Sequence, residues 1–181
     1  TISDAGAYAL GRKVDDLIAI DTHVHAEVSC CQAHDAFGEE FDRAADKYFG
    51  SDRRPTIAET VAYYRERKIG FVMFTVDAET QLGRRRIPNE EIAEAAAANP
   101  DIMLAFASID PHKGVMGARE ARRLIEDYGV RGFKFHPSVQ GFQPYDRFAW
   151  PLYEVIAEYG LPAIFHTGHS GIGSGMPRGG G

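Results

Sequence analysis

The chain has little of what would mark a membrane protein or a nucleic-acid-binding protein. It contains no apolar run long enough for a membrane span or a signal peptide. Its 20 basic residues are outnumbered by 26 acidic ones, which gives a net charge of −6. The longest basic run, residues 84–86, is more typical of a solvated loop than of a phosphate clamp. We therefore expect no nucleic-acid partner and no membrane partner.

Cysteine is also scarce. The two cysteines, Cys30 and Cys31, are neighbours, and a disulfide between them would close a strained eight-membered ring. They supply neither a disulfide framework nor a spaced metal-ligand motif. Because nothing in the sequence requires an oxidising compartment, a cytoplasmic location is the default expectation.

The hydrophobic residues are numerous enough for one domain with a sizeable core. They make up 44% of the 181 residues, so we treat residues 1–181 as a single domain. Short, continuous runs rich in Ile, Val and Phe are typical of strands in a parallel sheet that is covered on both faces. Five such runs occur, at residues 17–20, 71–76, 102–107, 130–135 and 162–165.

Helical patterns separate these runs. Thr56 and Glu59 have the spacing of a capping box, which predicts a helix that starts there. Apolar residues at helical spacing predict three more helices. These begin near residue 89, cover residues 121–128 and cover residues 148–159, the last with Pro151 in its first turns. Gly70, Gly129 and Gly160 lie between a helix and a strand, where we expect the left-handed conformation.

Strict alternation of strand and helix predicts an α/β protein with a parallel sheet. An open doubly wound sheet would carry a Gly-rich phosphate loop after its first strand. Here the first strand ends instead in residues 21–25, Asp-Thr-His-Val-His. We therefore favour a (β/α)8 TIM barrel, of which this chain covers about the first five β-α units. The connection at residues 26–54 is long and is expected to pass over the strand ends.

The first strand carries the strongest chemical signal. His23 and His25 are two residues apart, so both imidazoles can face one point. Imidazole is a suitable ligand for zinc or a similar divalent ion. Two histidines on a solvated strand end are the alternative, and the pair taken alone does not decide between them.

Other strand ends repeat this chemistry. Lys134 and His136 come at the end of the fourth run, and His166 and His169 at or just after the end of the fifth. Five of the seven histidines therefore lie at or just past strand ends, where the catalytic groups of a barrel are found.

A first strand ending in His23-Val24-His25, combined with His166 after the fifth strand, resembles the amidohydrolase superfamily. The resemblance is strongest to its family-2 branch, which includes aminocarboxymuconate semialdehyde decarboxylase and related hydrolases. It implies that His23, His25 and His166 bind one divalent metal ion, most commonly Zn²⁺. It also implies a His after a sixth strand and an Asp after an eighth, beyond residue 181.

Further roles follow for the residues around this site. Lys134 matches the position of a metal-bridging carbamate in other branches, but we favour an ammonium that contacts a substrate carboxylate or pairs with Asp77 or Asp110. His136 is expected to contact the substrate or to support the site, and His169 to hold a substrate carboxylate or to lie solvated in a loop. Asp21 is expected to face away from His23 in a structural role.

The expected function is hydrolysis of a small organic acid or carbonyl compound through a metal-activated water. A metal-dependent non-oxidative decarboxylase of the same family is the close alternative, and a non-catalytic metal-binding barrel is the third hypothesis. The expected partner is a small-molecule substrate, and a homo-oligomer stays open.

Overall fold

The computed structural model describes residues 14–33, 43, 46–47 and 54–168. Each of the five apolar runs contains or adjoins a strand, which confirms the prediction of a parallel α/β fold. The strands are β1 (Ala19–His25), β2 (Ile69–Phe74), β3 (Met103–Ala105), β4 (Phe133–Phe135) and β5 (Ala163–Phe165).

The strands follow one another across the sheet in chain order. β1 pairs with β2 and β2 with β3, and β4 pairs with β5, all in parallel. A parallel bridge between Ala107 and Phe133 joins the two parts, supported by the hydrogen bond from Lys134 N to the Ala107 carbonyl at 2.7 Å. A doubly wound sheet reverses its strand order at a switch point, whereas no reversal occurs among the described strands. The order therefore favours consecutive strands of a barrel over a doubly wound sheet.

The helices connect the strands as the sequence predicts. Thr56 and Glu59 form the expected capping box, and Pro151 lies in the first turn of the last helix. The main helices are α2 (Ile57–Glu66), α4 (Asn89–Ala98), α5 (Gly114–Glu126) and α7 (Trp150–Glu158). Two short helices, α3 (Glu79–Leu82) and α6 (Pro137–Gln140), follow β2 and β4. The last helix, expected from residue 148, begins at Trp150 instead. Phe148 precedes it in a 3-10 turn (Arg147–Ala149) and is 39% exposed.

The predicted left-handed glycines are correct at two of three positions. Gly129 and Gly160 have φ of 67° and 61°. The prediction is wrong at Gly70, which lies inside β2 and pairs with Ile20. Because β2 starts earlier than expected, the left-handed position falls on Lys68, with φ of 54°.

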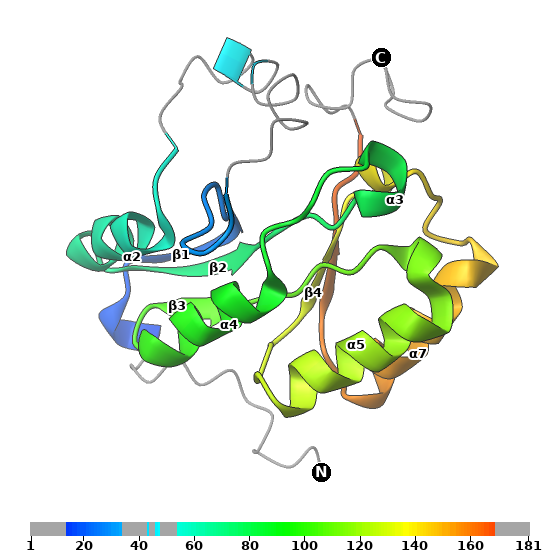
Figure 1. The fold of residues 1–181 in the computed structure, drawn as a ribbon. Coiled ribbons are helices and arrows are strands. Elements are labelled where there is room, and N and C mark those ends of the chain that lie inside the picture. The colour runs from blue at the N-terminus through cyan, green and yellow to red at the C-terminus, as the bar shows by residue number, and fades with distance from the viewer. Residues whose placement is uncertain (1–13, 34–42, 44–45, 48–53, 169–181) are drawn as a thin grey trace.

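The core lies between the sheet and the helices. Figure 1 shows α5 and α7 side by side next to β4, and α2 next to β1 and β2. The core includes large side chains that are almost fully buried, among them Phe71, Ile92, Leu124 and Phe133. Burial of each such side chain contributes about 1.5–3 kcal/mol to the stability of the fold. The strand ends that carry the polar residues therefore lie next to a well-packed core.

The segment that follows β1 is only partly described. Cys30 and Cys31 are joined by a disulfide, which closes the small ring between neighbours and links no two elements. The backbone of Cys30 and the hydroxyl of Ser29 donate to the carboxylate of Glu91 at 2.7 and 2.6 Å, which ties this segment to α4. Most of the long connection at 26–54 lies outside the described residues.

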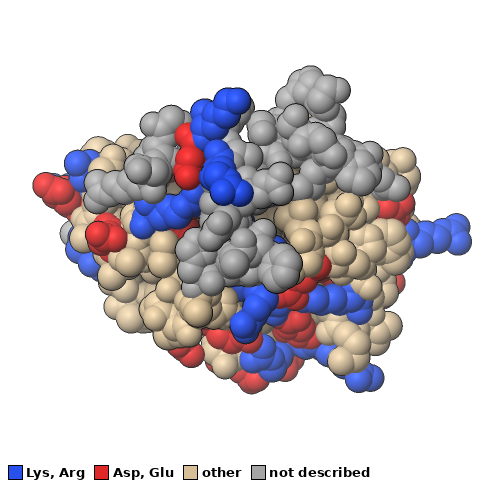
Figure 2. All heavy atoms as spheres, turned by 45° about the horizontal axis from the view of Figure 1, so that its top comes forward, with Lys and Arg blue, Asp and Glu red and all other residues tan. Residues whose placement is uncertain are grey.

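The surface mixes the two signs of charge. On the face shown in Figure 2, acidic and basic side chains lie next to one another. Within the described part of the chain, no helix is both long enough and apolar enough to span a membrane.

Candidate functional site

His23 and His25 converge at the end of β1. Their Nε2 atoms are 3.2 Å apart and their ring centroids 5.2 Å apart. Two nitrogens bound to one tetrahedral ion at about 2.0–2.1 Å would be about 3.3 Å apart. The spacing of this pair therefore fits two ligands of one divalent metal ion.

A strand irregularity precedes this pair. The register between β1 and β2 shifts between Asp21 and Val24, so an extra residue is inserted in β1. Such bulges change the direction of a side chain, and they are frequent near active sites. Asp21 accordingly accepts a hydrogen bond from the hydroxyl of Tyr64 on α2 at 2.6 Å, and it also accepts from the backbone of His23 at 2.9 Å. The predicted structural role of Asp21 is confirmed.

His166 follows β5 and lies beside His23. The two ring centroids are 6.3 Å apart, with the rings almost perpendicular. Among the described residues, no group of three or more His, Cys, Asp or Glu side chains is arranged so that it could hold a metal ion. The pair His23–His25 is thus assembled, while the three-histidine site stays a prediction.

Lys134 brings a buried cation to the same place. Its side chain is fully buried, and Nζ lies 3.5 Å from His23 Nε2 and 4.8 Å from the ring centroid of Phe74. The alternative that it pairs with Asp77 or Asp110 is wrong, because those carboxylates bind Lys113 and His112 instead. No carboxylate of the described residues is ion-paired with Lys134, and burial lowers its pKa to about 8.

His136 occupies the position after β4. Its ring stacks on that of His166, with centroids 4.1 Å apart and an interplanar angle of 8°. Its Nδ1 is 3.1 Å from the hydroxyl of Ser138. The structure thus brings four of the five strand-end histidines together, and the fifth, His169, lies outside the described residues.

Phe74 forms the base of the site, and sequence reasoning missed it. This fully buried residue ends β2 and meets the rings of His23 and His25 edge-on, at centroid distances of 5.3 and 4.9 Å. It gives the imidazoles and Lys134 an apolar surface on one side. The only local signal was its place at the end of a buried strand, which does not distinguish it from other core residues.

The electrostatics of the site favour neutral imidazoles. Burial and the neighbouring His23 and Lys134 lower the pKa of His25 to about 3. Burial, His166 and Lys134 lower the pKa of His136 to about 3 as well. A histidine must be neutral to bind a metal ion, so the arrangement keeps its nitrogen lone pairs free for ligation near neutral pH.

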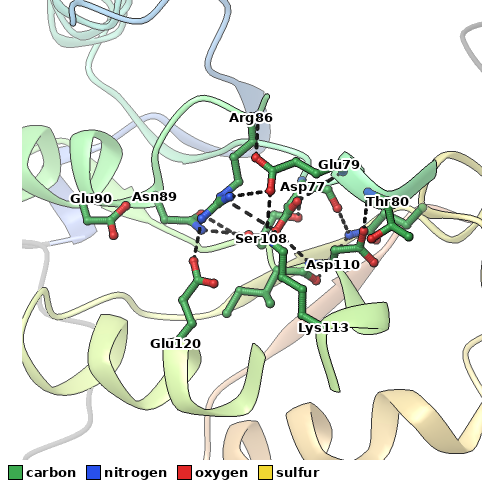
Figure 3. A network of polar contacts seen from close by, with 12 residues as sticks. Asp77, Glu79, Thr80, Arg86, Asn89, Glu90, Ser108, Asp110, Lys113 and Glu120 are labelled. Atoms are coloured by element: carbon green, nitrogen blue, oxygen red, sulfur yellow. Dashed lines mark hydrogen bonds and ion pairs between the residues drawn. The ribbon is translucent and has the colours of Figure 1, made fainter. Parts of the chain in front are cut away.

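A second polar cluster follows β2 and β3, and the sequence did not reveal it. We call Asp77, Glu79, Arg86, Lys113 and Glu120 the ion network. Figure 3 shows their side chains pointing toward one another. The fully buried Asp77 accepts from Lys113 Nζ at 2.6 Å, and Arg86 lies 3.0 Å from Glu79 and 2.7 Å from Glu120. For Arg86 the interpretation as a solvated loop residue is wrong, since only 18% of its side chain is exposed.

The comparison with known families decides the relationship. A family model described as amidohydrolase matches residues 20–179. The chain belongs to the amidohydrolase family. This confirms the resemblance seen in the histidine motif of β1 and in His166. No curated protein sequence matches the chain.

Solved structures show the same fold at low sequence identity. The 5-carboxyvanillate decarboxylase from Sphingomonas paucimobilis is 21% identical and superposes with a TM-score of 0.60, over 81% of this chain and 51% of that one. A putative amidohydrolase from Staphylococcus aureus is 14% identical and superposes with a TM-score of 0.56, over 83% of this chain and 48% of that one. A dihydroxybenzoic acid decarboxylase from Polaromonas was solved with manganese and the inhibitor 2-nitroresorcinol. It is 14% identical and superposes with a TM-score of 0.51, over 83% of this chain and 49% of that one. The chain spans about half the length of these structures.

Proposed function

We propose that this chain supplies the first five β-α units of a metal-dependent (β/α)8 enzyme that acts on a small organic acid. The observation that carries the proposal is the group of His23, His25 and Lys134 on the ring of Phe74. The histidine pair offers ligands to a divalent ion. The buried ammonium offers a positive charge to a small anionic substrate.

The donor atoms fit a resident metal ion in part. The 3.2 Å spacing of His23 and His25 suits two ligands, and His166 would be the third. Zinc is the ion expected from the imidazoles, and manganese is the ion in the Polaromonas structure. A divalent ion bound there would act as a Lewis acid toward a substrate oxygen.

Lys134 is suited to hold negative charge that develops during the reaction. A buried cation without a carboxylate partner is costly, and a substrate anion would remove that cost. Interactions accelerate a reaction only where they are stronger in the transition state than in the ground state. We therefore place Lys134 at the substrate oxygen that becomes negative, with the apolar ring of Phe74 beside it.

Two reactions develop such charge, and we favour decarboxylation. When a carboxylate leaves as carbon dioxide, its bonding electrons pass to the ring or carbonyl system, and an oxygen of that system carries the charge. Two of the similar solved structures are decarboxylases of hydroxylated benzoic acids. Hydrolysis is the second candidate, supported by the amidohydrolase family itself, and there the charge develops on the oxygen of the attacked carbonyl.

Metal binding by the full-length protein tests the ligands directly. We expect about one zinc or manganese ion per chain, and loss of that ion in His23→Ala and His25→Ala. The matched control is His112→Ala, because His112 binds Asp110 and lies outside the site. Full metal content in both site variants would contradict the proposed ligands.

Product analysis separates the two reactions. The full-length protein is incubated with 5-carboxyvanillate and with dihydroxybenzoate, and carbon dioxide release is measured before and after treatment with a chelator. Decarboxylation predicts metal-dependent release of carbon dioxide. If a small ester or lactone is the substrate, hydrolysis predicts that ¹⁸O from labelled water enters the carboxylate of the product without release of carbon dioxide. Equal activity with and without metal would refute both.

A further inference from the structure

The turn after β4 holds His136 at its backbone as well as at its ring. The backbone N–H of His136 donates to the side-chain carbonyl of Gln140 at 2.7 Å. Gln140 is fully buried, and its amide donates in turn to the backbone carbonyl of Asp77 at 2.8 Å. Gln140 thus ties the end of β4 to the end of β2.

Asp77 is itself firmly held. Besides Lys113, it accepts from the backbone N–H of Asp110 at 3.0 Å, and its own backbone N–H donates to Ser108 at 3.1 Å (Figure 3). A chain of buried hydrogen bonds therefore runs from the ion network through Gln140 to His136. Because each member is fixed by the next, the backbone of His136 has little freedom to shift.

The ring of His136 is also restricted. One of its faces lies against His166, and its Nδ1 meets Ser138. Its Nε2 makes no hydrogen bond within the described part of the chain. The fully buried side-chain atoms there that lack a partner are on Arg86 and Tyr153. The Nε2 atom of His136 is therefore left without a hydrogen-bond partner among the described residues, although the residue as a whole is only 5% exposed.

The Ser138 contact bears on which ring nitrogen carries the proton. Nδ1 of His136 is the only hydrogen-bond partner that the Ser138 hydroxyl has among the described residues. If Nδ1 carried the hydrogen and donated it, the hydroxyl hydrogen would have no acceptor among the described residues and would be left to solvent, since Ser138 is partly exposed. If the hydroxyl donates to an unprotonated Nδ1, that hydrogen is used, and the ring proton of the neutral imidazole lies on Nε2.

We propose that Ser138 is a positioning residue that fixes His136 as the Nε2–H tautomer, so that His136 donates a hydrogen bond to a substrate oxygen. The substrate part rests on the proposed function, whereas the tautomer part does not. His136 directly follows β4, and Lys134 lies in that strand, so both groups are at the C-terminal end of β4. Together they would provide a neutral donor and a cation for one developing negative charge.

The tautomer can be measured without any substrate. Long-range ¹H–¹⁵N correlation spectra of the full-length protein, recorded with zinc because zinc is diamagnetic, distinguish the two ring nitrogens, and the His136→Asn spectrum identifies the signals. We expect protonated Nε2 in the wild type and in Ser138→Thr, and a mixture of tautomers in Ser138→Ala. Ser29→Ala is the matched control, since its hydroxyl binds Glu91. Protonated Nδ1 in the wild type, or an unchanged tautomer in Ser138→Ala, would overturn the proposal.

Kinetics test the donor role. For carbon dioxide release from 5-carboxyvanillate, we expect Ser138→Ala to lower kcat about tenfold with KM within about twofold, as for loss of one hydrogen bond in the transition state. Ser138→Thr should restore kcat. An unchanged kcat in Ser138→Ala would refute the donor role. Absence of turnover in the wild type would count against the proposed function, and the tautomer would still be decided by the spectra.

Discussion

Two groups of polar side chains lie at the same edge of the sheet, and they balance their buried charges in opposite ways. The ion network, after β2 and β3, matches each buried charge with a partner, as in the pair of Asp77 and Lys113. The histidine site, on β1, β4 and β5, holds a buried Lys134 with no carboxylate paired to it among the described residues.

The contrast indicates which group is built for stability and which for binding. Natural proteins pair their buried charges, and exceptions cluster where a ligand completes the pairing. In the ion network, burial opposes the charge on Lys113, but the hydrogen bond from its ammonium to Asp77 outweighs burial and raises the Lys113 pKa. At Lys134 burial acts without such compensation and lowers the pKa. The ion network therefore pairs its charges internally, whereas the described residues supply no carboxylate to Lys134.

The largest expected effect comes from breaking the ion network. Lys113→Met removes the main partner of the fully buried Asp77, and we expect it to lower the free energy of unfolding by about 3 kcal/mol. The matched variant Lys134→Met removes a buried cation that has no carboxylate partner among the described residues, so it should leave stability unchanged or raise it. Urea unfolding of both full-length variants checks this. Equal destabilisation by the two would contradict the contrast between the groups.

Activity should respond in the reverse order. We expect Lys134→Met to lower kcat for carbon dioxide release about 100-fold, as for loss of one preorganised group that stabilises developing charge. Lys113→Met, assayed at a temperature where it is folded, should keep most of the wild-type kcat. Metal content, measured in parallel, should be unchanged in both variants. A full kcat in Lys134→Met would remove Lys134 from the mechanism.

The sequence predicts the histidine site better than the ion network, because the site's signals are local. His23 and His25 share one strand end, and a strand alternates its side chains over two residues. His136 and His166 follow the ends of their own strands. Asp77 and Lys113, in contrast, are 36 residues apart, and neither lies in a motif that predicts the other. Their pairing depends on how two βα units pack.

Smaller errors have the same origin. The bulge in β1 and the left-handed Lys68 depend on the register between β1 and β2, which the pattern of either strand alone does not define. The capping box at Thr56 and the glycines at positions 129 and 160 involve only neighbours in sequence, and they are confirmed. What one strand or helix determines was predictable, and what two elements determine together was not.

A moderate effect is expected on the pH dependence of stability. Burial would raise the pKa of Asp110, but hydrogen bonds from Thr80 and from the backbone of His112 outweigh it and lower the pKa below the ordinary 3.8. A carboxylate with a lowered folded pKa stabilises the fold above its unfolded pKa, and this contribution is lost as the pH falls through the folded pKa. The free energy of unfolding should therefore decrease below about pH 4. In Asp110→Asn that decrease should be shallower. Urea unfolding of both proteins between about pH 2.5 and about pH 7, a range that brackets the ordinary Asp pKa by about one unit or more, measures it. An identical slope in the two proteins would contradict this account.

The smallest effect separates the edge of the ion network from an ordinary surface pair. Glu120 binds Arg86 at 2.7 Å with both side chains less than one-fifth exposed, while Arg65 binds Asp101 at 2.8 Å with both more than one-third exposed. We expect Glu120→Gln to cost about 1 kcal/mol, because Arg86 keeps its contact with Glu79, and Arg65→Gln to cost less than about 0.5 kcal/mol. High salt should reduce the cost of Arg65→Gln more than that of Glu120→Gln, since exposed pairs are screened more strongly. If the two costs were equal at both salt concentrations, burial at the network's edge would add nothing, and only the Asp77–Lys113 pair would distinguish the network from the protein surface.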